Sequence, residues 1–308
     1  MIVRDRPSPL RLFFVMQGSI VPRIAPQIIC IFILGCLDLL LHRYYPAFFS
    51  GLTAAPFALM GLALSIFLGF RNSASYDRWW EARKQWGQLV IDTRSLARQV
   101  NSLMPEKGET GSLAARKITR LSIAFTHALR HHLRGTDAWS DIGDFLDHGM
   151  IDDLKRSRNL PDALLRQIGQ ELGRAVHSGL ISDVLYRPME ERLTSMASVQ
   201  AACERIHTTP LPFAYNLLLH RTAYLYCFLL PFGLASTLGL LTPLVSAIIA
   251  YTLFGLDALS EELEGPFGTS AHDLALSAIS RTVEVNLRET LDEQDLPADL
   301  TPDNFHLC

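Results

Sequence analysis

Long runs without a charged residue are the feature that most limits how this chain can fold. Residues 222–256 contain no Asp, Glu, Lys or Arg over 35 positions, and residues 51–70 contain none over 20. A helix of 20 residues rises about 30 Å, which is the thickness of the hydrocarbon core of a bilayer. The chain is therefore predicted to be a membrane protein.

The uncharged runs predict four membrane-spanning helices. The 35-residue run is long enough for two spans that are joined by a tight turn at residues 233–243, and residues 51–70 give a third. Residues 24–41 form the fourth, interrupted only by Pro26 and Asp38. A cleaved secretory signal is not expected there, because Asp38 lies inside the run and no small-residue cleavage site follows it.

Basic residues predict the orientation of these spans, because Lys and Arg in short loops tend to stay in the cytoplasm. Residues of this kind precede the first span and follow the second: Arg4, Arg6, Arg11, Arg23, Arg71, Arg78, Arg83 and Lys84. The connection at residues 42–50 has one Arg and an aromatic cluster that is typical of a membrane interface, made of Tyr44, Tyr45, Phe48 and Phe49. We therefore expect a multi-pass membrane protein with both termini and residues 71–212 in the cytoplasm.

The spans divide the chain into five segments. They are a cytoplasmic N-terminal segment (1–23), a first transmembrane pair (24–70), a cytoplasmic helical domain (71–212), a second transmembrane pair (213–257) and an acidic cytoplasmic tail (258–308). Residues 71–212 carry 20 Lys and Arg against 17 Asp and Glu, which argues against a nucleic-acid-binding surface. Since almost no alternating pattern is present, the predicted fold class is all-α.

The second span is predicted to continue far beyond the membrane. Past Arg71, apolar or small residues recur with the 3-4 spacing of a helix seam, at Trp79, Ala82, Trp86, Leu89, Thr93, Leu96, Val100 and Leu103. No proline interrupts residues 57–104. A single helix over this range would be roughly 70 Å long.

Two rows of side chains lie next to each other on the membrane part of that helix. Leu62, Ile66 and Phe70 recur every four residues, and an adjacent row of small residues, which favours close helix packing, contains Gly61, Ser65 and Gly69. If several copies surround an axis, the large row forms a hydrophobic constriction of the kind that gates by dewetting. Spacing alone favours the simpler interpretation that these three side chains face lipid.

Three segments resemble the bestrophin family of ion channels. GFRNSASYDRWWEARKQWG at residues 69–87 is similar to the signature that follows the second membrane helix of that family, including its bacterial relatives. ERIHTTPLPFAY at 204–215 and DALSEELEGPFG at 257–268 resemble two further family segments in the same order. The resemblance covers nearly the whole chain.

The resemblance implies a funnel-shaped homopentamer whose single pore is lined at the neck by the second membrane helix. The neck positions fall on Leu62, Ile66 and Phe70, which favours the pore interpretation over the lipid-facing one. A lower ring of one apolar residue per subunit is also implied, with Leu180 and Ile181 in SGLISD as candidates. The implied partners are other copies of the chain, membrane lipid and monovalent ions. No cofactor is implied.

No metal site is expected. Animal bestrophins have a run of acidic residues after the PFG segment that contributes to a calcium clasp, whereas this chain reads GPFGTSAHDLAL with only Asp273 nearby. The acidic residues before it are expected to be surface or helix-end charges: Glu261, Glu262 and Glu264. His127 and His131 are four apart but lack a third ligand, so we expect them on the surface of the soluble domain.

The resemblance thus implies a homopentameric channel of a bacterial inner membrane that conducts monovalent ions. The neck carries no charge, but 12 acidic against 2 basic residues beyond Arg221, and the likeness to the bacterial branch, favour cations. A chloride channel of the same fold and a non-conducting scaffold remain alternatives. No catalytic motif is present; an intramembrane enzyme or transporter would depend on Asp38, whereas His220 and Arg221 are expected to pair within the bundle or to snorkel.

Overall fold

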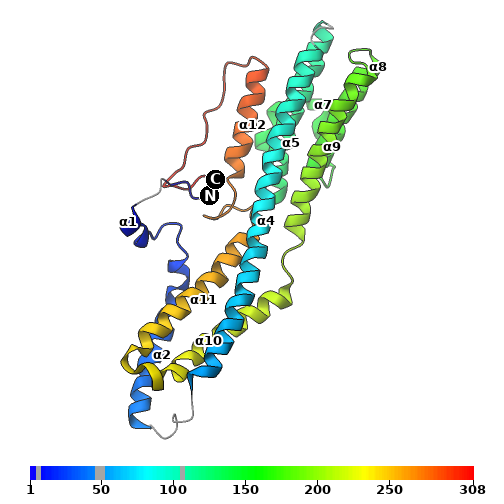
Figure 1. The fold of residues 1–308 in the computed structure, drawn as a ribbon. Coiled ribbons are helices and arrows are strands. Elements are labelled where there is room, and N and C mark those ends of the chain that lie inside the picture. The colour runs from blue at the N-terminus through cyan, green and yellow to red at the C-terminus, as the bar shows by residue number, and fades with distance from the viewer. Residues whose placement is uncertain (5–7, 46–52, 105–107) are drawn as a thin grey trace. The chain divides into compact units, whose positions relative to one another are not determined.

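The computed structural model describes residues 1–4, 8–45, 53–104 and 108–308 (Figure 1). Over these ranges the chain is helical, and two isolated β-bridges are its only β-structure. The predicted all-α class is thereby confirmed. Arg6, Phe48, Phe49 and the first two residues of the 51–70 run lie outside the described residues.

The chain folds into two compact units. We call Asp5–Trp79 with Pro210–Gly265 the apolar unit, and Met1–Arg4, Trp80–Thr209 and Pro266–Cys308 together the polar unit. The helices, including the short 3₁₀ helices η2 and η3, are α1 Pro9–Phe13, α2 Val21–Tyr44, α4 Ala54–Leu103, α5 Glu109–Arg134, α6 Trp139–Ile142, η2 Gly143–Phe145, α7 His148–Lys155, α8 Leu160–His177, α9 Asp183–Thr208, α10 Phe213–Leu238, η3 Gly239–Leu241, α11 Thr242–Glu264 and α12 Leu276–Thr290.

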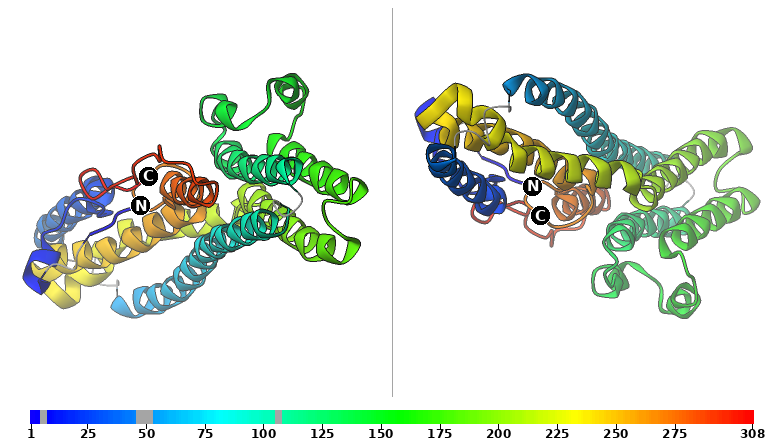
Figure 2. Two further views of the ribbon diagram at one scale, coloured as in Figure 1. Left: turned by 90° about the horizontal axis from the view of Figure 1, so that it is seen from above. Right: turned by 90° about the horizontal axis from the view of Figure 1, so that it is seen from below.

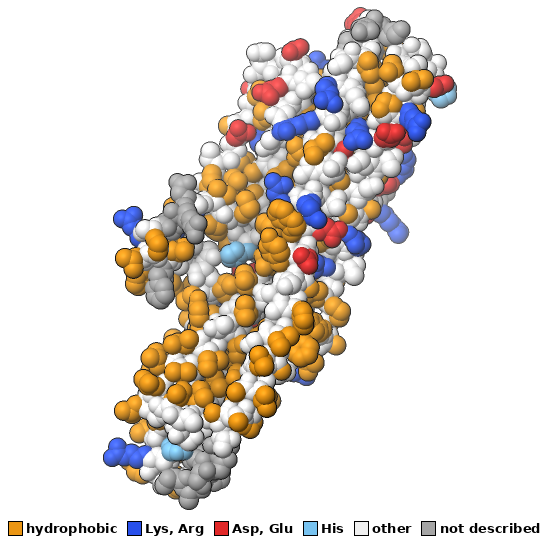
Figure 3. All heavy atoms as spheres, in the orientation of Figure 1, with side chains coloured by type: hydrophobic (Ala, Val, Ile, Leu, Met, Phe, Trp, Pro, Cys, Tyr) orange, Lys and Arg blue, Asp and Glu red, His pale blue; other side chains and the backbone are white. Residues whose placement is uncertain are grey.

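Helices of the apolar unit are long and hydrophobic enough to cross a membrane. The qualifying stretches are Val21–Tyr44, Ala54–Leu103 and Phe213–Glu264, and the last contains both α10 and α11. α11 packs against α2 and α10, as the two views of Figure 2 also show. Hydrophobic side chains dominate the face of this unit that is visible in Figure 3. At Gly35, a Cβ atom would lie 2.8 Å from Cα of Pro243, so only glycine allows α2 and α11 to approach this closely.

α4 is one helix of 50 residues, as the sequence predicts. The predicted seam forms the buried stripe of its later part, since Ala82, Trp86, Leu89, Leu96 and Val100 are all 0% exposed. A cluster of buried residues joins α4 to α5 and α12: Ala97, Ile123, Val283 and Leu287. The heptad pattern was therefore sufficient to identify the buried stripe of α4 but not the helices that cover it.

The acidic tail differs from the separate segment that the sequence suggested, because residues 266–308 are an integral part of the polar unit and residues 258–265 belong to the apolar unit. α12 packs on α5 through an apolar stripe that contains the fully buried Val283 and Leu287. The last residues also return to the first: the amide of Leu307 donates to the carbonyl of Met1 at 2.8 Å, and that of Ile2 donates to Ala271 at 2.9 Å. The net negative charge of the tail suggested a solvated segment, although α12 within it contributes to the core.

Candidate pore-lining helix

The row of large apolar residues on α4 is open to the surroundings in the single chain. Leu62, Ile66 and Phe70 are 62%, 50% and 64% exposed. On the same helix Leu64 and Leu68 are 3% and 0% exposed, and they belong to the core that the apolar unit forms with α10 and α11. Ile66 is two residues from each of these, which is about 200° around a helix. The row therefore points away from its own helix bundle.

Residues of the small row have different surroundings. A Cβ atom at Gly61 would lie 2.5 Å from the hydroxyl oxygen of Tyr226 on α10, so α4 and α10 are closely packed there. The hydroxyl of Ser65 donates to the carbonyl of Gly61 at 2.7 Å. Nothing lies within 4 Å of a Cβ atom placed at Gly69. Within one subunit, close packing thus involves Gly61, while Gly69 leaves room beside the row.

A buried ion pair holds α4 at Arg71, the residue that follows the row. Arg71 donates from Nη1 to Oδ1 of Asp257 on α11, and their side chains are 5% and 9% exposed. The other oxygen of Asp257, Oδ2, lies 2.8 Å from Nδ1 of His220 on α10. One carboxylate therefore connects three helices at a point one residue beyond Phe70. The expected pairing of His220 within the bundle is found here.

Further polar contacts extend this connection along α4. Nδ2 of Asn72 donates at 3.0 Å to the carbonyl of Leu256, and the hydroxyls of Ser75 and Ser260 are 2.9 Å apart. Arg78 donates from Nε to the carbonyl of Glu264 at 3.2 Å. The α4 residues 71, 75 and 78 are spaced by four and three, so they form a single stripe. This polar seam fixes the rotation of α4 and hence the direction in which the apolar row points.

The carboxylate of Glu264 completes the seam. Oε1 accepts from the backbone amide of Leu211 at 2.8 Å, and Oε2 accepts from Nδ2 of Asn216 at 3.1 Å. Segments that are far apart in sequence, around residues 71–78, 211–216 and 257–264, are thus hydrogen-bonded to one another. They are the three segments that carry the sequence resemblance, which explains why their residues occur together.

Comparison with known proteins agrees with this arrangement. The model of the bacterial/fungal bestrophin proteins matches residues 1–289. This chain belongs to the bestrophin family. It is similar to proteins named voltage-dependent anion channel-forming protein from Mesorhizobium japonicum (48% identity, covering 95% of this chain and 93% of the relative) and from Escherichia coli K12 (40%, covering 99% of both). A crystal structure of a bestrophin homolog from Klebsiella pneumoniae matches with a TM-score of 0.83 at 40% identity, over 88% of this chain and 99% of that one.

Bestrophin membership identifies the class of protein. The family and the printed names of the relatives are those of ion channels and not of enzymes. The polar seam is accordingly a structural support for a bestrophin membrane helix, and its titratable groups need no catalytic role.

The two candidates for the expected lower constriction, Leu180 and Ile181, differ in how far their side chains are exposed. Ile181 is 4% exposed and belongs to the core of the polar unit, while Leu180 is half-buried. Val184, in the first turn of α9, is 80% exposed. A ring residue must present its side chain to a passage, so Val184 suits that role better than Ile181. Exposure cannot be read from the six-residue motif SGLISD, so the sequence alone did not bring Val184 into consideration.

The acidic residues near the PFG segment are used in local contacts. Glu261 and Glu262 of α11 pair with Arg23, and Oδ2 of the buried Asp273 accepts from the amide of Ser270 at 2.7 Å. Within the described parts of the chain, no group of three or more His, Cys, Asp or Glu residues is arranged to hold a metal ion.

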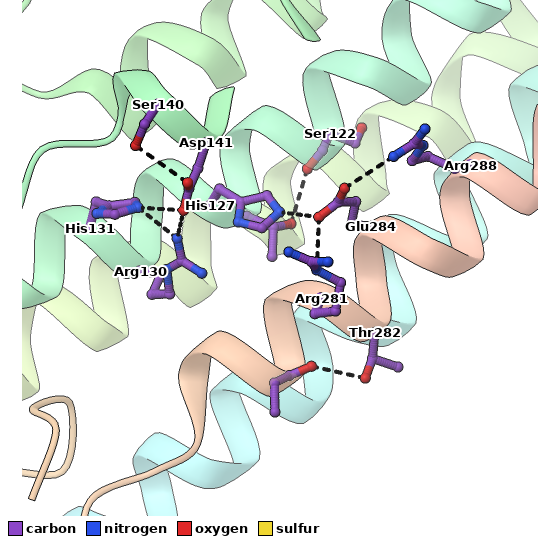
Figure 4. Close-up of polar contacts among 12 residues, drawn as sticks. Ser122, His127, Arg130, His131, Ser140, Asp141, Arg281, Thr282, Glu284 and Arg288 are labelled. Carbon is purple, nitrogen blue, oxygen red and sulfur yellow. Dashed lines mark hydrogen bonds and ion pairs between the residues drawn. The ribbon is translucent and has the colours of Figure 1, made fainter. Parts of the chain in front are cut away.

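A cluster of charged residues fixes the tail helix α12 to α5 in the polar unit (Figure 4). Nε2 of His127 lies 3.1 Å from Oε2 of Glu284, and His127 is only 3% exposed. The expected surface position of His127 is therefore wrong. Nε2 of His131 lies 3.0 Å from Asp141. An i, i+4 histidine pair looked like a surface feature because the pattern of α5 itself does not show that α12 covers this side of the helix.

Glu284 makes the attachment of α12 dependent on pH. Burial alone would raise its pKa, but the hydrogen bond with His127 and the nearby Arg281 and Arg288 outweigh burial, so the pKa of Glu284 lies below its ordinary value. A depressed carboxylate pKa contributes stability above the unfolded-state value of about 4.3, and this contribution is lost as the pH falls through the folded-state pKa.

We expect Glu284→Gln to remove this acid-side dependence. Hydrogen exchange of α12 amides should become faster in the variant at pH 6, where the wild-type carboxylate is charged. The difference from wild type should shrink as the pH falls below 4. The exposed Glu289 of the same helix provides a matched control, and Glu289→Gln should exchange like wild type. Equal exchange rates in Glu284→Gln and wild type at pH 6 would contradict the assignment.

Proposed function

We propose that this bestrophin is the pore-forming subunit of a homopentameric ion channel in a bacterial inner membrane. Its four spans would be α2, the first part of α4, α10 and α11, with both termini in the cytoplasm. The observation that carries the proposal is the exposed row of Leu62, Ile66 and Phe70, which points away from the subunit's own core. Five copies of this row around an axis form an uncharged hydrophobic neck. Ions cross such a neck when it is filled with water and are blocked when it dewets.

Two observations support anion conduction. The printed names of the relatives specify anion channels. The acidic tail, which favoured cations, has part of its charge neutralised: Glu284 and Glu293 pair with arginines of the polar unit, and Glu261 and Glu262 pair with Arg23. The tail is therefore a weaker source of negative potential than its composition suggests. We accordingly favour anion conduction over the cation preference.

Reversal potentials test both parts of the proposal. The purified protein is reconstituted into planar bilayers with a tenfold sodium chloride gradient. We expect currents that reverse near the chloride equilibrium potential. Reversal near the sodium equilibrium potential would support the channel but would show that it conducts cations. The absence of any current above that of protein-free bilayers would favour the scaffold alternative. Mass measurement of the intact assembly gives the number of subunits, for which we expect five.

A further inference from the structure

The line of the exposed apolar row on α4 continues to a carboxylate. Residues that are seven or eleven positions apart on a helix are turned by only about 20° relative to each other. Asp77 is seven residues beyond Phe70 and eleven beyond Ile66, so it lies on the line of the row. The rise over seven residues is about 10 Å. Asp77 is therefore the first charged side chain on this line after the apolar row.

The polar seam supports the same direction independently. Arg71, Ser75 and Arg78 contact α11 from the side of α4 that faces its own bundle. Asp77 is about 100–160° around the helix from each of these residues. Its side chain is exposed in the single chain, as are those of the row. The contacts that fix the rotation of α4 thus direct Asp77 away from the bundle together with the row.

The other carboxylates of α4 are held within the subunit. Glu81 pairs with Arg205 of α9. Asp92 is 0% exposed, and its Oδ2 accepts from the hydroxyl of Ser195 at 2.6 Å. Over the parts of the chain that the structure describes, Asp77 has no hydrogen-bond or ion-pair partner. Its negative charge is therefore not balanced within the subunit.

We infer that Asp77 sets the ion preference at the cytoplasmic end of the neck, where five copies of its carboxylate form a negative ring. The inference rests on the proposed channel. Because the neck itself carries no charge, the nearest unbalanced charge decides which ions concentrate at its entrance. A ring of carboxylates concentrates cations and repels anions. It acts against the anion conduction proposed above, so it limits the anion current and admits sodium beside chloride.

The salt dependence of the current separates this electrostatic effect from a change in the shape of the pore. The Debye length is about 10 Å at 0.1 M ionic strength and about 3 Å at 1 M. The ring lies about 10 Å along the helix from Phe70. Its field therefore reaches the neck in 0.1 M salt and is screened in 1 M salt.

The test compares wild type with Asp77→Asn, which keeps the shape of the side chain and removes its charge. Reversal potentials are measured in planar bilayers under tenfold sodium chloride gradients, one centred near 0.1 M and one near 1 M. In the dilute gradient the ratio of chloride to sodium permeability should rise about twofold or more in Asp77→Asn, and further in Asp77→Lys. The differences should shrink in the concentrated gradient, and Asp77→Glu should behave like wild type.

Glu261→Gln is the matched control, because it removes an exposed carboxylate of the same unit from α11 instead of α4. It should keep the wild-type permeability ratio. A ratio that is equal in wild type and Asp77→Asn, while both carry current, would overturn the role of Asp77 and leave the channel in place. If that equality comes with a lower Tm of the Asp77→Asn assembly, Asp77 instead pairs with a neighbouring subunit. The absence of current in wild type would overturn the channel itself.

Discussion

Replacing Asp257 with alanine is expected to prevent this protein from accumulating in a folded state. The substitution leaves the guanidinium of Arg71 buried at 5% exposure without its carboxylate, and it also removes the partner of His220. Breaking a buried pair in this way costs about 3–5 kcal/mol. This is a large part of the 5–15 kcal/mol that typically separates folded from unfolded proteins. Size-exclusion profiles and Tm of detergent extracts measure the effect.

An exposed ion pair of the same unit provides the control. Glu261 pairs with Arg23, and their side chains are 59% and 46% exposed, so Glu261→Ala should cost no more than about 1 kcal/mol. The double variant Arg71→Met with Asp257→Leu should recover much of the lost stability, because replacing both partners avoids an unpaired buried charge. Equal Tm values for Asp257→Ala and Glu261→Ala would show that the seam does not hold α4.

Substituting serine for Ile66 and Phe70 is expected to increase ionic current strongly. In the proposed channel these side chains form rings that expel water from the neck, and hydroxyl groups at the same positions would keep it hydrated. We expect single-channel conductance or open probability to rise about threefold or more in planar bilayers. The selectivity should change less, because serine introduces no charge.

Phe67→Ser is the matched control for the Ile66→Ser variant of this experiment. Phe67 is on the same helix and is 50% exposed, but it lies about 100° around the helix from Ile66. Its substitution should leave the conductance close to that of the wild type. If Ile66 and Phe70 instead face lipid, their serine variants should be less stable but should carry the wild-type current, because a hydroxyl directed at acyl chains does not affect the pore. Unchanged currents in the Ile66→Ser and Phe70→Ser variants would therefore reject the neck assignment.

Local sequence patterns were sufficient for the helices but not for their partners. The uncharged runs and the 3-4 spacing from Trp79 onward predicted the apolar helices and the 50-residue α4, because helix periodicity is written into neighbouring residues. The Arg71–Asp257 pair joins residues 186 positions apart. No periodicity records such a contact, and only the joint resemblance of the two segments indicated that they belong together.

The residues whose environment was not predicted from the sequence are buried by distant segments. His127 and Ile181 lie in segments of mixed polarity, and both are buried because α12 and the helices of the polar unit cover them. Asp38 is the one acidic residue that interrupts the run at residues 24–41, and its side chain is fully buried. In each case a distant segment decides the environment. An acidic tail that contains an apolar stripe was the signal that sequence reasoning did not use.

The contribution of α12 to the core shared with Ala97 and Ile123 has a consequence for biosynthesis. Residues 80–209 leave the ribosome first, then α10 and α11 have to enter the bilayer, and only afterwards does Val283 emerge. At about 5–20 residues per second, this delay lasts several seconds. Throughout that time the apolar faces of α4 and α5 stay uncovered and accessible to chaperones and proteases. The segment Pro266–Cys308, which is made last, thus decides whether the earlier part of the polar unit escapes degradation.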